Sequence, residues 1–195
     1  NSMLFKTAAT SALKINSDQE VLPQSHMRIK DSKALYLGDS NDFTLTHDAT
    51  DCRIRYNHSV GALKFQQNDN STVGMFDTSG RLLIGTAAGR SAAGVTAQLQ
   101  VEGTSYDTSS LNLIINANST QPPYLSLAKT RGTSDGSSTI VQANDYLGLI
   151  QFCGADGTDI ESRGAEISAE VDGSPGSNDM PGRLVFKTTA DGAAS

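Results

Sequence analysis

The chain has little material for a large hydrophobic core. It contains no tryptophan, aromatic residues make up 6% of its 195 positions, and hydrophobic residues make up 37%. Globular domains usually carry about 45–50% apolar residues, glycine included. One copy is therefore expected to bury too little apolar area to offset the entropy of ordering the chain. Two outcomes remain, disorder or assembly with other chains.

Assembly fits the sequence better than disorder. Charged residues make up only 18% of the chain, and β-branched and leucine-rich segments recur along it. Disordered chains are poor in such segments and richer in charge. We therefore expect each chain to complete its core against neighbouring chains.

Basic residues and long apolar runs are also scarce. Lys and Arg number 15 against 21 Asp and Glu, the net charge is −6, and no basic cluster occurs. Nucleic acid is therefore not expected as a partner, since phosphate binding needs a basic surface. No apolar run approaches the roughly 20 residues of a membrane span, and the N-terminal residues lack the apolar stretch of a secretion signal. Membrane insertion is not expected either.

The two cysteines point to no particular chemistry. Cys52 and Cys153 lie far apart, with no CxxC pair and no nearby histidine pair, so neither a zinc site nor a redox motif is indicated. Both are expected to be small buried apolar residues. A disulfide between them stays open.

Short apolar segments with turn residues between them dominate what is present. Apolar and polar residues alternate with the period of a half-buried strand, and Gly, Asn and Asp cluster where tight turns need them. No long helical pattern interrupts these segments, so the chain is expected to be all-β. The strands are predicted at residues 13–15, 27–29, 35–37, 43–46, 52–56, 63–65, 73–76, 81–85, 97–103, 111–117, 124–129, 139–141, 147–152, 165–171 and 183–188.

Three segments follow from this pattern. An N-terminal β-repeat segment covers residues 1–60, a second β-repeat segment covers residues 61–94, and a C-terminal β-rich fibre domain covers residues 95–195. The second segment ends in Ala87-Ala-Gly-Arg-Ser-Ala-Ala-Gly, which is small and nearly free of apolar bulk. This composition is typical of a linker between domains.

Several motifs resemble tail-fibre proteins of tailed bacteriophages. Asp77-Thr-Ser-Gly-Arg-Leu-Leu-Ile-Gly-Thr resembles a module, D-x-x-G-R-apolar-x-I-G-T, that recurs in these fibres. The stretch Leu35-Tyr-Leu-Gly-Asp-Ser-Asn-Asp-Phe-Thr-Leu-Thr-His-Asp is similar to a repeat of the same family. Residues 140–192 resemble the shaft modules of such fibres, especially those of marine and cyanobacterial phages.

The resemblance implies an elongated homotrimeric fibre of short strands, built as a triple β-helix or as interleaved small β-domains. It implies a structural protein of the virion tail fibre, made in the cytoplasm of the bacterial host and involved in host attachment. No enzymatic activity, catalytic residue or cofactor is expected. The implied partners are further copies of the chain, other virion tail proteins, and a glycan or protein receptor on the host surface. In this family, similar segments precede a C-terminal chaperone domain that cleaves itself off after the trimer assembles.

Two other functions stay open, a tailspike-type polysaccharide depolymerase and a bacterial or prophage surface adhesin. A depolymerase uses two carboxylates, one of them as an acid. Glu166 and Glu170 alternate with apolar residues, so we expect them on the solvent face of a strand, and Asp156 and Asp172 precede glycines and are expected in turns. The clustered carboxylates are Asp156, Asp159, Glu161, Glu166, Glu170 and Asp172.

The histidines show no metal-binding spacing within one chain. In a trimer, however, one histidine per chain at the axis makes a ring of three, which suits a transition metal. Of His26, His47 and His58, His47 is the candidate for such an axial ring.

Receptor contact is expected from exposed polar loops, because weak contacts repeated on several copies gain from multivalency. Three loops qualify, at residues 38–42, 131–138 and 173–179. The candidate contact residues are Asp39, Ser40, Asn41, Arg131, Thr133, Ser134, Asp135, Ser174 and Asn178.

Overall fold

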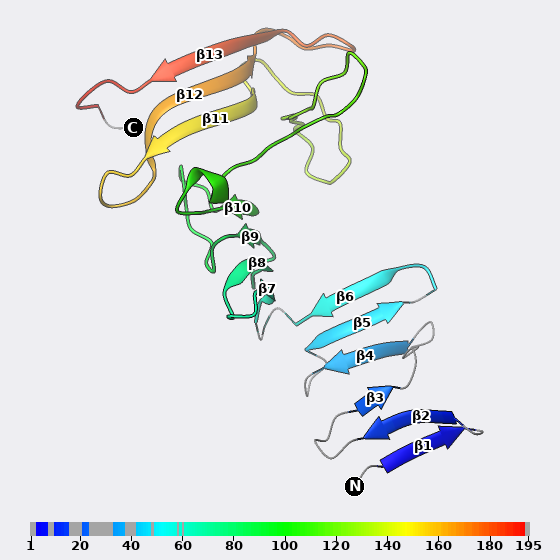
Figure 1. Cartoon of the computed structure of the whole chain (residues 1–195). Coiled ribbons are helices and arrows are strands. Elements are labelled where there is room, and N and C mark those ends of the chain that lie inside the picture. Colours follow the sequence, from blue (N-terminus) through cyan, green and yellow to red (C-terminus); the bar gives the residue numbers. More distant parts are fainter. Residues whose placement is uncertain are drawn as a thin grey trace. The chain divides into compact units, whose positions relative to one another are not determined.

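In the computed structural model the chain is all-β, as the sequence predicts (Figure 1). The structure describes residues 3–7, 10–15, 21–23, 33–37, 42–47, 49–57, 59 and 61–193. These residues contain thirteen strands in four sheets and one short 3-10 helix, but no α-helix. Consequently the described residues include no helix of a length and hydropathy suited to spanning a membrane. The chain forms two units, Asn1–Leu63 and Lys64–Ser195.

The N-terminal unit contains two antiparallel sheets of three strands each. The predicted strands at 13–15, 35–37, 43–46 and 52–56 are confirmed, and the one at 27–29 lies outside the described residues. The first sheet consists of β1 (Met3–Thr7), β2 (Thr10–Ile15) and β3 (Val21–Pro23), and the second of β4 (Lys33–Leu37), β5 (Phe43–His47) and β6 (Cys52–Tyr56).

The register of the second sheet follows the alternation of its residues. Leu35 lies opposite Leu45, which lies opposite Ile54. Residues directly opposite each other share one face of a sheet. The three apolar side chains therefore form a row across β4, β5 and β6.

The C-terminal unit begins with a four-stranded sheet in the order β10-β9-β8-β7. In chain order, the first three of these strands confirm the strands predicted at residues 63–65, 73–76 and 81–85. The last one in the chain lies within the strand predicted at residues 97–103. β10 runs parallel to β9, so residues 87–94, predicted to be a linker between domains, instead connect two strands of one sheet. The strands are β7 (Leu63–Gln66), β8 (Thr72–Phe76), β9 (Leu82–Ile84) and β10 (Leu99–Val101).

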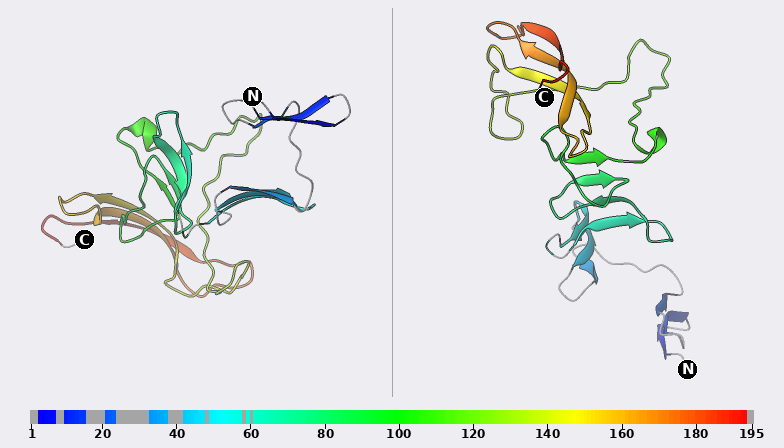
Figure 2. Two further views of the ribbon diagram at one scale, coloured as in Figure 1. Left: turned by 90° about the horizontal axis from the view of Figure 1, so that it is seen from below. Right: turned by 90° about the vertical axis from the view of Figure 1, so that its left-hand side faces the viewer.

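A three-stranded antiparallel sheet follows, made of β11 (Tyr146–Gly154), β12 (Ser162–Val171) and β13 (Gly182–Thr188), which confirms the last three predicted strands (Figure 2). The turn between β11 and β12 forms where the Asp-Gly pair predicts it. The Asp156 carboxylate accepts the N–H of Thr158 at 2.8 Å, and Gly157 has a φ of 98°, which favours glycine.

Three predicted strands do not form. Residues 111–117, 124–129 and 139–141 belong to no strand, although the first two show the expected apolar pattern. The only regular element between β10 and β11 is the 3-10 helix η1 (Tyr106–Thr108). Alternation decides which side chains share a face, but a strand also needs a hydrogen-bonded partner, and no described strand pairs with these residues.

The hydrophobic core of a single copy is small, as its composition predicts. Among the described residues, the buried apolar side chains are Met75, Leu83, Val141 and Val171. Most other large apolar residues are exposed or half-buried. One copy therefore leaves most of its apolar surface in water.

Candidate functional site

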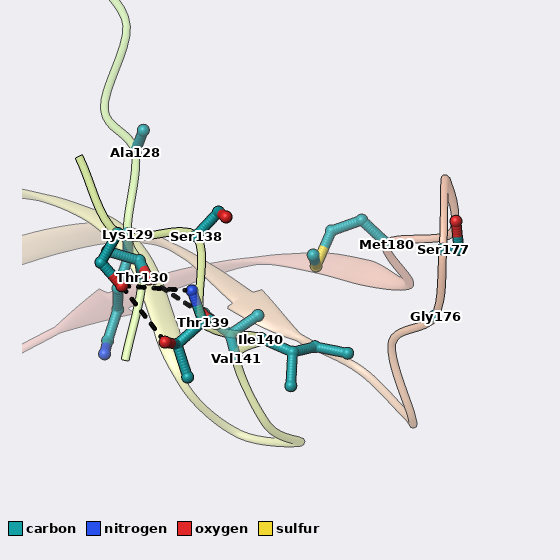
Figure 3. A pocket seen from close by; sticks show the side chains of 11 residues that line it. Ala128, Lys129, Thr130, Ser138, Thr139, Ile140, Val141, Gly176, Ser177 and Met180 are labelled. Carbon is teal, nitrogen blue, oxygen red and sulfur yellow. Dashed lines mark hydrogen bonds between the residues drawn. The ribbon is translucent and has the colours of Figure 1, made fainter. Parts of the chain in front are cut away.

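Two of the loops that the sequence singles out border one open hollow in the C-terminal unit (Figure 3). The hollow has a volume of about 670 Å³. One wall comes from residues 128–141, on both sides of the loop 131–138. The other comes from the loop before β13. The lining residues are Ala128, Lys129, Thr130, Ser137, Ser138, Thr139, Ile140, Val141, Gly176, Ser177 and Met180.

Residues 130–139 form a loop closed by hydrogen bonds at its base. The Arg131 N–H donates to the Thr139 carbonyl at 3.1 Å, and the Thr130 hydroxyl donates to the same oxygen at 2.9 Å. The Ser137 N–H donates to the Ser134 carbonyl at 3.2 Å, which makes the tip a tight turn. These bonds hold the loop without any neighbouring strand.

An ion pair ties this loop to the start of β11. The Arg131 guanidinium donates two hydrogen bonds to the two carboxylate oxygens of Asp145, each at 2.7 Å. The same carboxylate accepts the Gln142 N–H at 2.9 Å. The Arg131 contacts, followed by the Gln142 bond, hold the pKa of Asp145 well below its usual range. Arg131 therefore has a structural role in addition to the receptor contact that the sequence predicts for it.

The second wall is a tight turn between β12 and β13. Gly176 and Asp179 exchange both backbone hydrogen bonds, at 2.9 and 3.2 Å. Asn178 adopts a φ of 57°, a left-handed conformation that asparagine tolerates. The Asp172 N–H donates to the Pro181 carbonyl at 2.9 Å and closes the base of this loop.

The lining combines hydroxyl groups with apolar surface. Ile140 and Met180 are exposed and lie between the two loops (Figure 3), while Val141 is buried beneath them. Hydroxyls both donate and accept hydrogen bonds, and exposed apolar groups pack against the nonpolar face of a ligand. The hollow thus has the polar and apolar groups that binding a sugar ring or a peptide needs. The hydroxyls are those of Thr130, Ser137, Ser138, Thr139 and Ser177.

The candidate contact residues that the structure describes lie beside the hollow rather than in its lining. All six are exposed on the two loops: Arg131, Thr133, Ser134, Asp135, Ser174 and Asn178. Asp39, Ser40 and Asn41 lie outside the described residues. Ile140 and Met180 are not among the site residues predicted from the sequence, because residues 139–141 are predicted to form a strand and Met180 follows the predicted loop 173–179.

His47 lies at the end of β5 and is half-buried. His26 and His58 lie outside the described residues. No group of three or more histidine, cysteine or acidic side chains arranged for a metal ion occurs in the described part of a single chain. A ring of His47 side chains contributed by three chains stays a prediction.

The cysteines differ from expectation. Cys52 is exposed and Cys153 is half-buried, and both are free thiols. Cys52 is exposed because β6 is the edge of its sheet and nothing in the described unit covers that strand.

The prediction that Glu166 and Glu170 face solvent is wrong. They are 4% and 8% exposed, because the register of the sheet places Lys187 opposite Glu166 and Arg183 opposite Glu170. The long basic side chains cover the two carboxylates. The face that carries Ile167 and Ala169 is the more exposed face of β12.

Both glutamates are held by basic side chains, and Lys187 lies near both of them. Lys187 and Arg163 both bind Glu166 at 2.8 Å. Arg183 binds Glu170 at 2.7 Å, and the Ser168 hydroxyl donates to it at 3.0 Å.

The Lys187 contact lowers the pKa of Glu166 below its ordinary value, and the Arg183 contact, with that of Ser168, does the same for Glu170. A general acid in glycoside hydrolysis needs a raised pKa. The arrangement thus favours a structural role for both groups.

Comparison with known proteins adds no family. No protein-family model matches the chain, and no curated protein matches it.

Proposed function

We propose that this chain is a structural segment of a tailed-bacteriophage tail fibre, which assembles as a homotrimer and takes part in attachment to the host. The observation that carries the proposal is the apolar surface of one copy. Among the described residues only four apolar side chains are buried, whereas large apolar side chains are exposed on β4, β5, β6 and on most later strands. A monomer gains stability mainly by burying such side chains, so their exposure favours burial against other chains.

Three features of the sequence and fold support assembly into a fibre. The strands are short, the core of one copy is small, and large apolar side chains are exposed in several sheets. Clusters of exposed apolar side chains are typical of interaction sites. The threefold symmetry and the elongated form, as a triple β-helix or as interleaved small β-domains, come from the resemblance of the Asp77–Thr86 module and the shaft-like segments to tail fibres.

Within such a fibre, the hollow between residues 128–141 and 176–180 is the proposed receptor contact. Three copies around an axis would present three hollows, so a weak affinity for one host glycan or protein segment would gain from multivalency. The other partners would be neighbouring tail proteins of the virion.

The absolute mass of the purified chain tests the proposal. Light scattering after size exclusion is expected to give a species of three times 20.5 kDa at micromolar concentration. A monomer at that concentration would overturn the proposal, because the exposed apolar surface would then have no partner of its own kind.

The receptor contact has a separate test. Binding of the trimer to an array of bacterial surface polysaccharides is expected to be lost in Met180→Lys, which places a charge in the hollow. The control is Val73→Lys, which changes an exposed apolar residue outside it. Both variants are first checked for trimeric mass. Equal binding by the two variants would contradict a role for the hollow.

A further inference from the structure

Residues 109–129, hereafter the unpaired segment, have the sequence of strands but no strand partner. Every residue of the segment is exposed. Within the described part of the chain, none of them makes a backbone-to-backbone hydrogen bond. Figure 2 draws the segment as a green trace without an arrow. Its large apolar residues are Leu111, Leu113, Ile114, Ile115, Tyr124, Leu125 and Leu127.

The first part of this segment has the pattern of a half-buried strand. Leu111, Leu113 and Ile115 recur with a period of two, and the positions between and after them are Asn112, Ile114 and Asn116. In a strand, the three apolar side chains would point to one face. Such a pattern is stable only against a second strand and an apolar surface.

The sheet β11–β12–β13 offers both a strand to pair with and an apolar surface. One of its faces carries Ile150, Ile167 and Phe186 in register, flanked by Phe152 and Leu184. Ile167 on the central strand is half-buried, and of the two edge strands β13 is the more exposed, with 67% for Leu184 and 71% for Phe186 against 45% for Ile150 and 54% for Phe152 on β11. The least covered part of this apolar face thus lies at the β13 edge.

At the β11 edge, the end of the unpaired segment lies close to this sheet. A Cβ atom added to Gly148 would lie 2.8 Å from the Cβ of Leu127, so the end of the unpaired segment packs on β11. No strand of the described residues pairs with the outer edge of β13. An exposed apolar edge of this kind is a template for pairing with another chain.

We propose that residues 111–116 of one copy pair with the free edge of β13 in a second copy and add a fourth strand to the sheet. Leu111, Leu113 and Ile115 continue the apolar face beside Leu184 and Phe186. Backbone hydrogen bonds supply affinity, and the alternate side chains supply register. This inference rests on the proposed homotrimer. The many large apolar side chains that one copy leaves exposed are the reason that the partner is a second copy.

Hydrogen exchange of the assembled 195-residue chain, read by mass spectrometry, tests the pairing. Amides in residues 111–116 are expected to exchange at least ~100-fold more slowly than in a free peptide, because interchain hydrogen bonds open only with the interface. Dilution to monomer is expected to remove this protection. A trimer of the correct mass in which these amides exchange at free-peptide rates would overturn this inference alone, whereas a monomeric wild type would overturn the trimer as well.

Proline variants locate the hydrogen bonds. The N–H groups of Leu113 and Ile114 point to opposite edges of a strand, so only one of them can donate to β13. The proline substitution at that residue removes an interchain hydrogen bond, and the proline substitution at the other residue is tolerated. In one of the two proline variants, the protection of residues 111–116 and of β13 from hydrogen exchange is expected to fall by at least ~10-fold. Asp135→Pro, in a turn with no strand, is the control. Unchanged protection in both strand variants would contradict the pairing.

The acceptor is tested through β13. Phe186→Ser is expected to remove the protection of residues 111–116, because it deletes the most exposed apolar side chain next to the added strand. Phe65→Ser changes a phenylalanine that is also exposed but lies in β7, and should leave that protection unchanged. Loss in Phe65→Ser and not in Phe186→Ser would place the partner strand elsewhere and refute the assignment to β13.

Discussion

The carboxylate of Asp77 binds both the backbone and the side chain of Arg81 and so closes the turn between β8 and β9. One oxygen accepts the N–H groups of Ser79 and Arg81 at 2.8 and 2.9 Å, and the other accepts Arg81 Nε at 2.8 Å. Arg81 Nη2 lies 2.7 Å from the same second oxygen. Gly80 supplies a φ of 76°. The fixed positions of the D-x-x-G-R motif thus each have a physical task in this turn.

Asp77→Asn is expected to lower the melting temperature of the assembled protein. Asparagine keeps an acceptor for the backbone N–H groups but loses the charged oxygen that binds the guanidinium. Thr78→Ala, at an exposed position of the same turn, is the control. Thermal unfolding followed by circular dichroism measures both. An Asp77→Asn melting temperature equal to that of the control would show that the ion pair adds nothing.

Acid is expected to destabilise the C-terminal sheet through Glu166 and Glu170. Both pKa values lie below the ordinary value of 4.5 in the folded protein, so the ionised form favours folding. This stability is fully present above pH 4.5 and is lost as the pH falls through the lowered folded values. Urea midpoints measured from pH 7 to pH 2 should be flat at first and then fall. The fall should be smaller in Glu170→Gln; an equal fall in that variant would assign the effect to other carboxylates.

Leu83→Ala is expected to be strongly destabilising. Leu83 has no exposed surface, and truncating a fully buried leucine usually costs about 2–5 kcal/mol. Ile84→Ala is the matched control, because the neighbouring side chain in β9 is exposed. Urea unfolding at fixed protein concentration gives the free energy of unfolding of each. A similar loss in both variants would mean that assembly buries Ile84 as well as Leu83.

Gly85→Ala separates backbone strain from steric collision. Gly85 has a φ of 77°, and a Cβ there would collide with the Glu102 carbonyl oxygen next to β10. Gly80 has nearly the same φ, but its Cβ would meet nothing within 4 Å. Gly80→Ala is expected to cost about 1–2 kcal/mol from the left-handed backbone alone, and Gly85→Ala distinctly more. Equal free energies of unfolding for the two variants would show that β9 and β10 shift enough to accommodate the methyl group.

The local elements that the sequence predicts correctly are those whose partners lie nearby in the chain. β4, β5 and β6, and likewise β8 and β9, are consecutive strands separated by only a few residues. Apolar alternation and turn residues then specify the strand and its partner together. Leu111, Leu113 and Ile115 show the same period of two, yet no described strand pairs with them, and the strand prediction fails.

The candidate site illustrates a second limit. Composition marks residues 131–138 and 173–179 as exposed loops, and the structure agrees. That both loops border the same hollow, with Ile140 and Met180 between them, depends on the path of the chain around β11, β12 and β13. Sequence spacing carries no such information.

Residue periodicity alone determined that the chain is all-β and where most strands and turns lie, because φ/ψ preferences and turn chemistry act over a few residues. Tertiary structure decided which face of each strand is covered. Glu166 and Glu170 are buried while Ile150 and Phe186 are exposed, because cross-strand register brings Lys187 and Arg183 over the carboxylates. A single strand shows the two faces by its alternation, but only its neighbours decide which of them is buried.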